Sequence, residues 1–108
     1  IRPLSAKEAV ALIEGGGLVI DVRSPGEYEG GHLEGVPNIP LDLLKEEIGK
    51  VAPDTGSIVL LHCASGVRSM VGARSLRAMG YEHAHNLGSF RRARRLLRRA
   101  KGGVASRD

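Results

Sequence analysis

Short apolar runs alternate with segments of helical pattern along this chain of 108 residues. Residues 18–22 and 58–61 consist largely of Leu, Ile and Val, which is typical of strands buried on both faces. The segment that begins with Ser5-Ala-Lys-Glu8 has the pattern of a capping box at the start of a helix. Because strands that alternate with helices favour parallel sheets covered on both faces, the pattern predicts an α/β protein.

Turn and cap signals divide the chain into a single series of elements. We expect five strands, at 1–2, 18–22, 36–40, 58–61 and 83–87, and helices at 6–14, 41–48, 69–79 and 90–101, with one helical turn after Ser24. The predicted fold is three-layered, with a mostly parallel five-stranded sheet flanked by helices on both faces. One domain spans residues 1–108, and residues 103–108 are expected to form a frayed tail.

The chain holds one cysteine, so an internal disulfide is excluded. A lone cysteine fits a reducing compartment, and we expect a cytoplasmic monomer that uses no cofactor. No apolar stretch is long enough to cross a bilayer. Because the chain begins with Ile1 rather than Met, an upstream segment could have been removed.

That cysteine, Cys63, stands where the strand at 58–61 gives way to a helical segment. Open parallel sheets bind their ligands at the carboxyl ends of the strands. Free backbone N–H groups and the positive end of a helix favour an anion there, and a thiolate is an anion. The sequence therefore indicates a candidate nucleophile at Cys63.

The residues after the cysteine favour a tight loop around a negative charge. Ala64 and Ser65 are small, and Gly66 permits backbone angles that other residues resist. The N–H groups of such a loop can point inward as an anion-binding nest, which lowers the pKa of a thiol. Arg68 could donate to the same anion, or it could tie the loop to Asp21 or another acid.

Two longer stretches carry a family signature. The first runs from Asp21 to Pro40 (DVRSPGEYEGGHLEGVPNIP) and is similar to the pattern D-V-R-x-x-x-E-[YF]-x-x-G-H-[IL]-x-G-[AS]-x-N-[IV]-P, with Val36 at a position that is usually small. The second is the loop from Cys63 to Arg68 that runs into Ser69, and the segment Asn86-Leu-Gly fits as well. The chain thus resembles the single-domain rhodaneses, which are sulfurtransferases.

The resemblance implies thiosulfate sulfurtransferase activity with Cys63 as the catalytic nucleophile. The Cys63 thiolate would attack the sulfane sulfur of a donor such as thiosulfate, sulfite would leave, and a persulfide would remain. Cyanide in the test tube, or a thiol or protein cysteine in the cell, would accept the sulfur. The substrate-binding loop would comprise Ala64, Ser65, Gly66, Val67 and Arg68, and the residues that support it would be Asp21, Arg23 and Ser69.

Two other functions stay open. In a non-catalytic or sulfur-relay binding module, the loop would pass on sulfur or recognise a partner with negligible thiosulfate turnover. A phosphatase or arsenate reductase is less favoured, because protein tyrosine phosphatases place five residues between Cys and Arg. Here four residues separate Cys63 from Arg68, and a shorter loop suits a sulfur atom better than a phosphate group.

Two features depart from the family pattern. Ala64 and Ser65 are neutral where some thiosulfate-specific relatives carry basic residues, which weakens the case for thiosulfate as the natural donor. The last helix lacks the tryptophan of the family, and we expect Leu96 or Leu97 to fill its space.

The four histidines have simpler interpretations than catalysis or metal binding. His62 is expected to be satisfied by hydrogen bonds at the strand end, because a preformed thiolate needs no general base. His32 is expected to structure its own loop. His83 and His85 share one face of a strand without a third ligand nearby, so we expect exposed side chains and no metal site.

Residues 91–101 hold seven of the sixteen basic residues and no acidic residue. An apolar stripe runs through the same segment, formed by Phe90, Ala93, Leu96, Leu97 and Ala100. We expect the helix to pack on the sheet and to keep a solvated basic face. The functional alternative is a docking surface for an acidic protein, RNA or anionic lipid, of which we retain the acidic protein and expect neither nucleic acid nor membrane.

Overall fold

The computed structural model describes residues 2–105, with side chains described through residue 101. In chain order, its elements are α1 (Ala6–Glu14), β1 (Leu18–Asp21), α2 (Pro25–Glu29), the 3₁₀ helix η1 (Leu41–Leu43), α3 (Leu44–Val51), β2 (Val59–His62), α4 (Val67–Ala78), β3 (Ala84–Gly88) and α5 (Phe90–Ala105).

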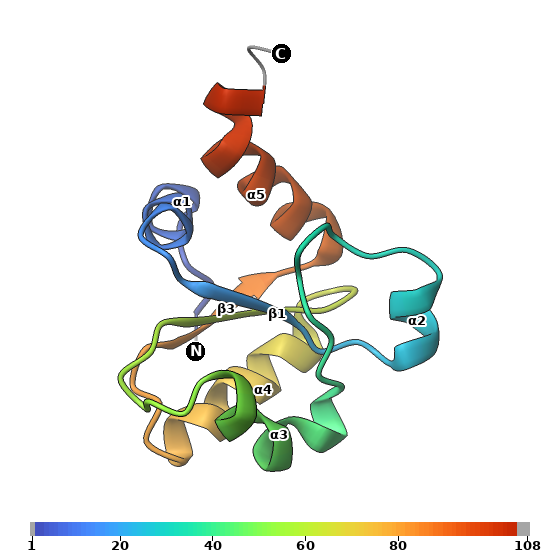
Figure 1. Ribbon diagram of the computed structural model, residues 1–108, viewed down its shortest axis with the longest axis vertical. Coiled ribbons are helices and arrows are strands. Elements are labelled where there is room, and N and C mark those ends of the chain that lie inside the picture. The colour runs from blue at the N-terminus through green and yellow to red at the C-terminus, as the bar shows by residue number, and fades with distance from the viewer. Residues whose placement is uncertain (1, 106–108) are drawn as a thin grey trace.

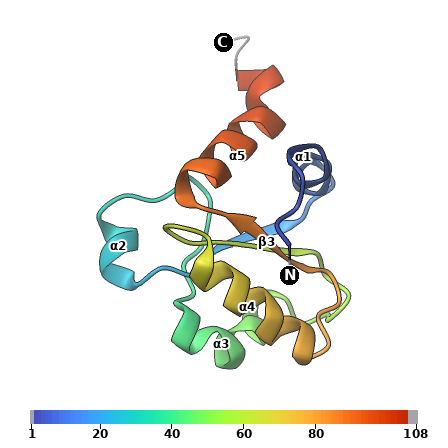
Figure 2. The same ribbon diagram turned by 180° about the vertical axis from the view of Figure 1, so that it is seen from behind.

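The sheet forms the middle of three layers. β2 lies between β1 and β3, and both pairings are parallel. Helices α1 and α5 lie together on one face, while α3 and α4 cover the other (Figures 1 and 2). The predicted three-layer α/β architecture is confirmed.

The central strand β2 is buried on both faces, as its apolar sequence predicts. Leu60 belongs to the cluster beneath α1 and α5, together with Val19 and Leu96. Leu61 belongs to the opposite cluster, beneath α3 and α4, together with Leu76. Burial of each of these side chains stabilises the folded state by about 1.5–3 kcal/mol. This packing fixes the position of β2 and therefore of the residues that follow it.

The sheet has three strands among the described residues, where the sequence analysis expected five. The extended segment at 36–40 makes only a single parallel bridge, between Asp21 and Asn38. Asp21 N donates to Pro37 O, and Ile39 N donates to Asp21 O, both at 2.9 Å. Prolines at 37 and 40 have no N–H to extend this ladder. Residue 1, in the expected first strand, lies outside the described residues.

Helix starts follow the local cap signals closely. The capping box at Ser5 is present, and Ser24 caps α2 with Glu27 as its reciprocal partner and Pro25 in the first turn. Helix α4 begins two residues before the predicted residue 69, because Gly66 adopts a φ of 99° and turns the chain directly into the helix.

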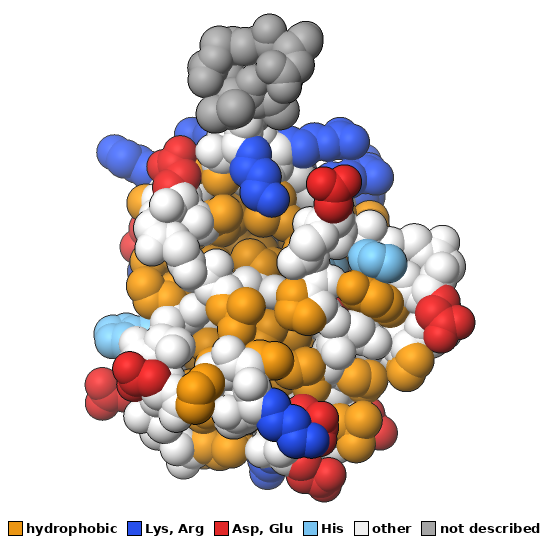
Figure 3. All heavy atoms as spheres, in the orientation of Figure 1, with side chains coloured by type: hydrophobic (Ala, Val, Ile, Leu, Met, Phe, Trp, Pro, Cys, Tyr) orange, Lys and Arg blue, Asp and Glu red, His pale blue; other side chains and the backbone are white. Residues whose placement is uncertain are grey.

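Helix α5 packs through its apolar stripe and keeps its arginines outside. Ala93 and Leu96 are buried, whereas the side chains of Arg91, Arg94, Arg95, Arg98 and Arg99 are exposed. Figure 3 shows Lys and Arg side chains gathered at the end of the molecule that carries α5. The helix continues to Ala105, and residues 106–108 of the expected frayed tail lie outside the described residues. Within the described range, no helix combines the length and apolarity that a bilayer crossing requires.

Candidate active site

Cys63 directly follows β2, at the carboxyl edge of the sheet, and its side chain is buried. Two backbone hydrogen bonds of 3.2 Å fasten its loop to the junction of β3 and α5. Cys63 N donates to Gly88 O, and Phe90 N donates to Ala64 O. The loop is therefore held at both sides by elements that come later in the chain.

Three donors surround the sulfur of Cys63. Gly66 N lies 3.0 Å from Sγ, and both Ser69 N and Ser69 Oγ lie 3.4 Å from it. Burial acts to raise the pKa of the thiol, but the hydrogen bonds from Ser69, Gly66 and Ser65 outweigh burial and lower the pKa below its ordinary value. A lowered pKa enriches the thiolate, which is the nucleophilic form.

Gly66 makes the tight turn of the loop possible. Its positive φ of 99° lies in the left-handed region. A Cβ at this position would stand 3.5 Å from the backbone of Gly88, so the loop lies against β3 with little spare room. The carbonyl of Gly66 accepts from Ser69 Oγ and from Asn86 Nδ2, both at 3.2 Å. Ala64, Ser65 and Val67 lie on the outside of the loop and are exposed.

Asn86 on β3 is a part of the site that the sequence analysis did not single out. Its Oδ1 accepts from Ser69 Oγ at 2.7 Å and from Gly88 N at 3.0 Å. It thereby links the last strand to the first turns of α4. The only signal in the sequence was its membership of the short Asn86-Leu-Gly segment, which suggests family membership but no role.

Arg68 pairs with Glu27 rather than with Asp21. Its two terminal nitrogens donate to the two carboxylate oxygens of Glu27 at 2.7 and 3.0 Å, across 41 residues of sequence. The hydrogen bond from Arg68 lowers the pKa of Glu27 to about 2, and the pairing raises the pKa of Arg68. Of the roles considered for Arg68, the structure places it as a tie between the loop and an acid, which is Glu27 on α2.

Asp21 and Arg23 form a buried ion pair at the end of β1. Arg23 Nη2 lies 2.8 Å from Asp21 Oδ2, and the same nitrogen donates to Gly31 O at 2.8 Å. The guanidinium stacks over the ring of Phe90, 4.6 Å from its centroid. Phe90 N in turn donates a hydrogen bond to Ala64 O. The Asp21–Arg23 pair is therefore connected to the cysteine loop through Phe90 and not by a direct hydrogen bond.

His62 meets the expectation that hydrogen bonds would satisfy it at one ring nitrogen only, since Nδ1 contacts Cys63 O at 3.4 Å. Its Nε2 is buried without a hydrogen-bond partner among the described residues, 3.7 Å from Asp21 Oδ2. Burial lowers the pKa of His62, although the Asp21 charge opposes this effect. The prediction is wrong for Nε2 alone, because Phe90 meets the imidazole edge-on and encloses the strand end.

The other histidines lie away from the sulfur. His32 stacks on Tyr28 with ring centroids 3.7 Å apart and contacts Tyr28 O at 2.8 Å, so it structures its loop as expected. His83 is exposed, as expected, whereas His85 is partly buried beside Arg77.

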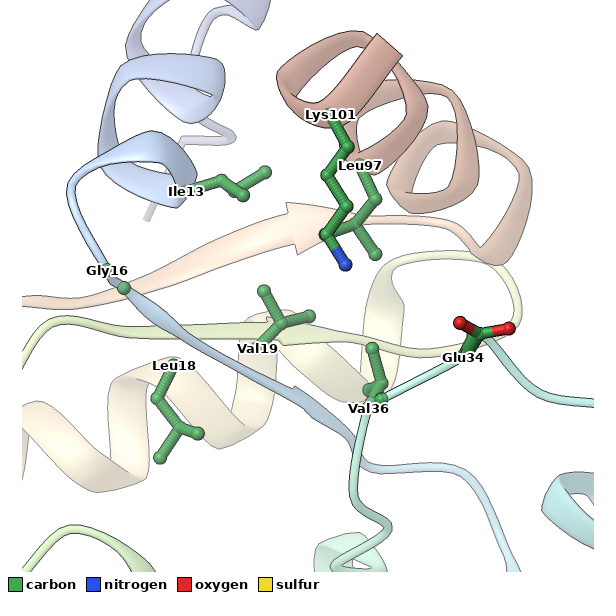
Figure 4. Close-up of a pocket in the computed structure, with 10 residues that line it drawn as sticks. Ile13, Gly16, Leu18, Val19, Glu34, Val36, Leu97 and Lys101 are labelled. Atoms are coloured by element: carbon green, nitrogen blue, oxygen red, sulfur yellow. The ribbon is translucent and has the colours of Figure 1, made fainter. Parts of the chain in front are cut away.

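Two hollows flank the loop, and a third lies elsewhere. A pocket of about 450 Å³ adjoins Ser65, Gly66 and Asn86 on one side. A smaller one, of about 260 Å³, adjoins Arg68 and Leu41 on the other. The pocket in Figure 4 lies between α1, β1 and α5, has Glu34 and Lys101 among its lining residues and contains no cysteine. Cys63 itself lines none of these three hollows, and the two beside the loop are lined by residues that follow it in the chain.

A family model described as a rhodanese-like domain matches residues 5–92, a span that contains every residue of the site described above. The chain belongs to the rhodanese family. The thiosulfate sulfurtransferase PspE of Escherichia coli is 39% identical over 72 residues, which cover 67% of this chain and 69% of that protein.

Solved structures of rhodaneses have the same fold. A rhodanese with anions from E. coli is 38% identical, with a TM-score of 0.66 over 68% of this chain and 87% of that one. A human single-domain sulfurtransferase, TSTD1, superposes with a TM-score of 0.72 over 85% of this chain and 94% of that one. At 24% identity, the human structure supports the rhodanese fold alone.

Proposed function

We propose that this rhodanese-like protein is a sulfurtransferase that carries sulfur as a persulfide on Cys63. The observation that carries the proposal is the set of three hydrogen-bond donors within 3.4 Å of Sγ at the carboxyl edge of the sheet. Donors in this arrangement stabilise a charged sulfur before and after reaction. The similarity to PspE, a thiosulfate sulfurtransferase, supports the reaction class.

The first step loads the cysteine. The Cys63 thiolate attacks the sulfane sulfur of a donor such as thiosulfate, and the sulfur–sulfur bond of the donor breaks. Sulfite leaves with the electron pair, so no general acid is needed for the leaving group. The new bond makes a Cys63 persulfide whose terminal sulfur carries the negative charge. The N–H groups of Gly66 and Ser69, at 3.0 and 3.4 Å from Sγ, are the donors available to stabilise it.

The second step unloads it. A thiolate or cyanide attacks the terminal sulfur, the bond from that sulfur to Sγ breaks, and Cys63 regains its thiolate. With cyanide the product is thiocyanate, and with a thiol it is a new persulfide. Because the thiolate is restored with its lowered pKa, the site is ready for another donor.

Sulfur loading can be measured directly by intact mass. Wild type treated with thiosulfate should gain one sulfur, about 32 Da, and should form thiocyanate when cyanide is added. The Cys63→Ala variant should do neither. Failure of wild type to gain sulfur from several sulfane donors, or equal turnover by the variant, would overturn the proposal. Loading without turnover would identify a sulfur-relay module instead.

A phosphatase or arsenate reductase function has less support. The loop holds one residue fewer than the loop of the tyrosine phosphatases, and the guanidinium of Arg68, which would have to bind the oxyanion, is engaged by Glu27. Hydrolysis of a phosphotyrosine analogue that depends on Cys63 would reverse this ranking.

The basic face of α5 is a second, separate proposal. Five exposed arginines (Arg91, Arg94, Arg95, Arg98 and Arg99) stand on one helix, and none contacts a carboxylate among the described residues. We infer a docking surface for an acidic protein, which in this reading accepts or delivers sulfur. Binding of such a partner should weaken steeply as salt is raised, and it should be lost on replacing Arg94 and Arg98 by Gln. If neither raised salt nor the two substitutions weakens binding, the proposal is wrong and the arginines of α5 form only a solvated face.

A further inference from the structure

Both arginines that frame the cysteine loop are neutralised by carboxylates. Arg68 makes two hydrogen bonds to Glu27, and Arg23 is buried against Asp21. A third arginine, Arg92, adjoins the larger pocket, but its guanidinium is fastened to the backbone oxygens of Leu87 and Leu4. Arg92 therefore keeps its positive charge beside the loop, but in the described part of the chain no guanidinium at the loop is free of hydrogen-bond partners.

Arg68 is the cation that could change this. It is the only charged side chain in the loop and the first turn of α4, and its side chain is 39% exposed at the rim. Its charge is near enough to act on Cys63. Glu27 is itself fixed, because Ser24 N donates to its Oε1 at 3.0 Å and Ser24 Oγ accepts from its N–H. The carboxylate thus holds the guanidinium from a rigid position on α2.

The charge of the donor then decides how easily it reaches the sulfur. The attacking thiolate is an anion, and thiosulfate is a dianion, so the two repel each other in a partly buried site. Backbone N–H dipoles offset part of this repulsion. The charge of Arg92 offsets a further part. An unpaired Arg68 would offset more, but Glu27 neutralises it, and Ala64 and Ser65 add no charge.

We infer that Glu27 is a specificity-determining positioning residue, which holds Arg68 away from the incoming donor. The site consequently prefers sulfane sulfur on a neutral or singly charged organic molecule, such as an alkyl persulfide or a thiosulfonate, over the dianion thiosulfate. This inference rests on the proposed sulfurtransferase function.

Two donors that share a sulfur–sulfonyl bond but differ in charge test the inference. Thiosulfate carries two negative charges and releases sulfite when its sulfane sulfur is attacked. Methanethiosulfonate carries one negative charge and releases methanesulfinate. The ratio of kcat/KM for thiosulfate to kcat/KM for methanethiosulfonate should rise about fivefold in Glu27→Gln, which is the scale of one half-exposed ion pair. Glutamine keeps the reciprocal cap with Ser24, so α2 should persist.

Matched variants separate charge from structure. Glu29→Gln removes the same charge from the same helix at an exposed position that makes no ion pair among the described residues, and it should leave the ratio unchanged. Adding Arg68→Met to Glu27→Gln should abolish the gain. The gain should also shrink as salt is raised, which a purely structural effect would not do.

The outcomes are distinguishable. If neither donor loads Cys63 in wild type, the sulfurtransferase function itself fails. If both donors load the protein but Glu27→Gln leaves their ratio within twofold of wild type, Glu27 does not set specificity and the inference is overturned. A rise in the ratio that persists after Arg68→Met would overturn it as well.

Discussion

The hydroxyl of Ser69 lies 2.7 Å from Asn86 Oδ1 and 3.4 Å from Cys63 Sγ, and the carbonyls of Gly66 and Gly88 are further acceptors at 3.2 and 3.4 Å. A hydroxyl has one proton to donate. Asn86 Oδ1 also accepts from Gly88 N, so it stays satisfied when the proton turns away. The Ser69 hydroxyl can therefore serve Asn86 while the sulfur is protonated and serve the sulfur once it is charged.

Ser69→Ala should raise the pKa of Cys63, because the variant removes the side-chain donor that contributes most to lowering it. At neutral pH, alkylation by iodoacetamide should slow by about three- to tenfold, the scale of one ordinary hydrogen bond of about 1 kcal/mol. The measurement is the alkylation rate as a function of pH. Ser75→Ala on the same helix is the control and should match wild type, and an unshifted profile in Ser69→Ala would leave the backbone donors as the sole cause.

Gly66→Ala should impair both folding stability and sulfur loading. The left-handed φ of 99° would cost an alanine about 1–2 kcal/mol. Relaxation of that strain would move the N–H that lies 3.0 Å from Sγ. Thermal unfolding and persulfide mass report the two effects. Gly49→Ala in α3, where an added Cβ meets nothing, should be neutral or stabilising by up to about 1 kcal/mol.

Asp21→Asn should lower the free energy of unfolding by about 3 kcal/mol, because it leaves the Arg23 guanidinium buried without its counter-charge. Urea unfolding measures the loss. The comparison is Glu47→Gln, which breaks the exposed pair with Lys50 and should cost less than about 1 kcal/mol. Similar losses in the two variants would show that burial does not amplify the Asp21–Arg23 pair.

The Glu27–Arg68 pair should make stability depend on pH in the acid range. The pKa of Glu27 falls from 4.5 to about 2 on folding, so the carboxylate form is favoured by the folded state. The stabilisation is complete above about pH 5 and is lost as the pH falls toward 2. The difference in Tm between wild type and Glu27→Gln should narrow over that interval. A difference that stays constant from pH 6 to pH 2.5 would contradict the pairing.

Local signals predicted the scaffold of this site well. The serine caps at Ser5 and Ser24, and the apolar run of β2, are decided by residues within a few positions of each other. The turn at Gly66 is also decided locally. The helix that follows it was predicted to begin at residue 69, but it begins at Val67. A glycine at the turn releases the following residues into the helix, which propensity alone does not register.

Contacts between segments that are distant in the sequence could not be predicted. Nothing near Arg68 in the sequence indicates Glu27 as its partner, because the two lie 41 positions apart and several other acidic residues were available. The role of Asn86 needed the register of β3 against β2, which places it opposite Leu61. The lack of a hydrogen-bond partner at His62 Nε2 likewise depends on Phe90, which covers the end of the strand.

The cysteine loop is tied to residues that a ribosome adds about twenty positions after the cysteine itself. Cys63 N bonds to Gly88, Ala64 O accepts from Phe90, and Ser69 bonds to Asn86. A nascent chain that has exposed Cys63 but not yet β3 would lack these ties, which hold the loop in place around the sulfur. The complete set of loop contacts would then form only after residues 86–90 have been made, so a product interrupted between the loop and β3 would carry the cysteine without them.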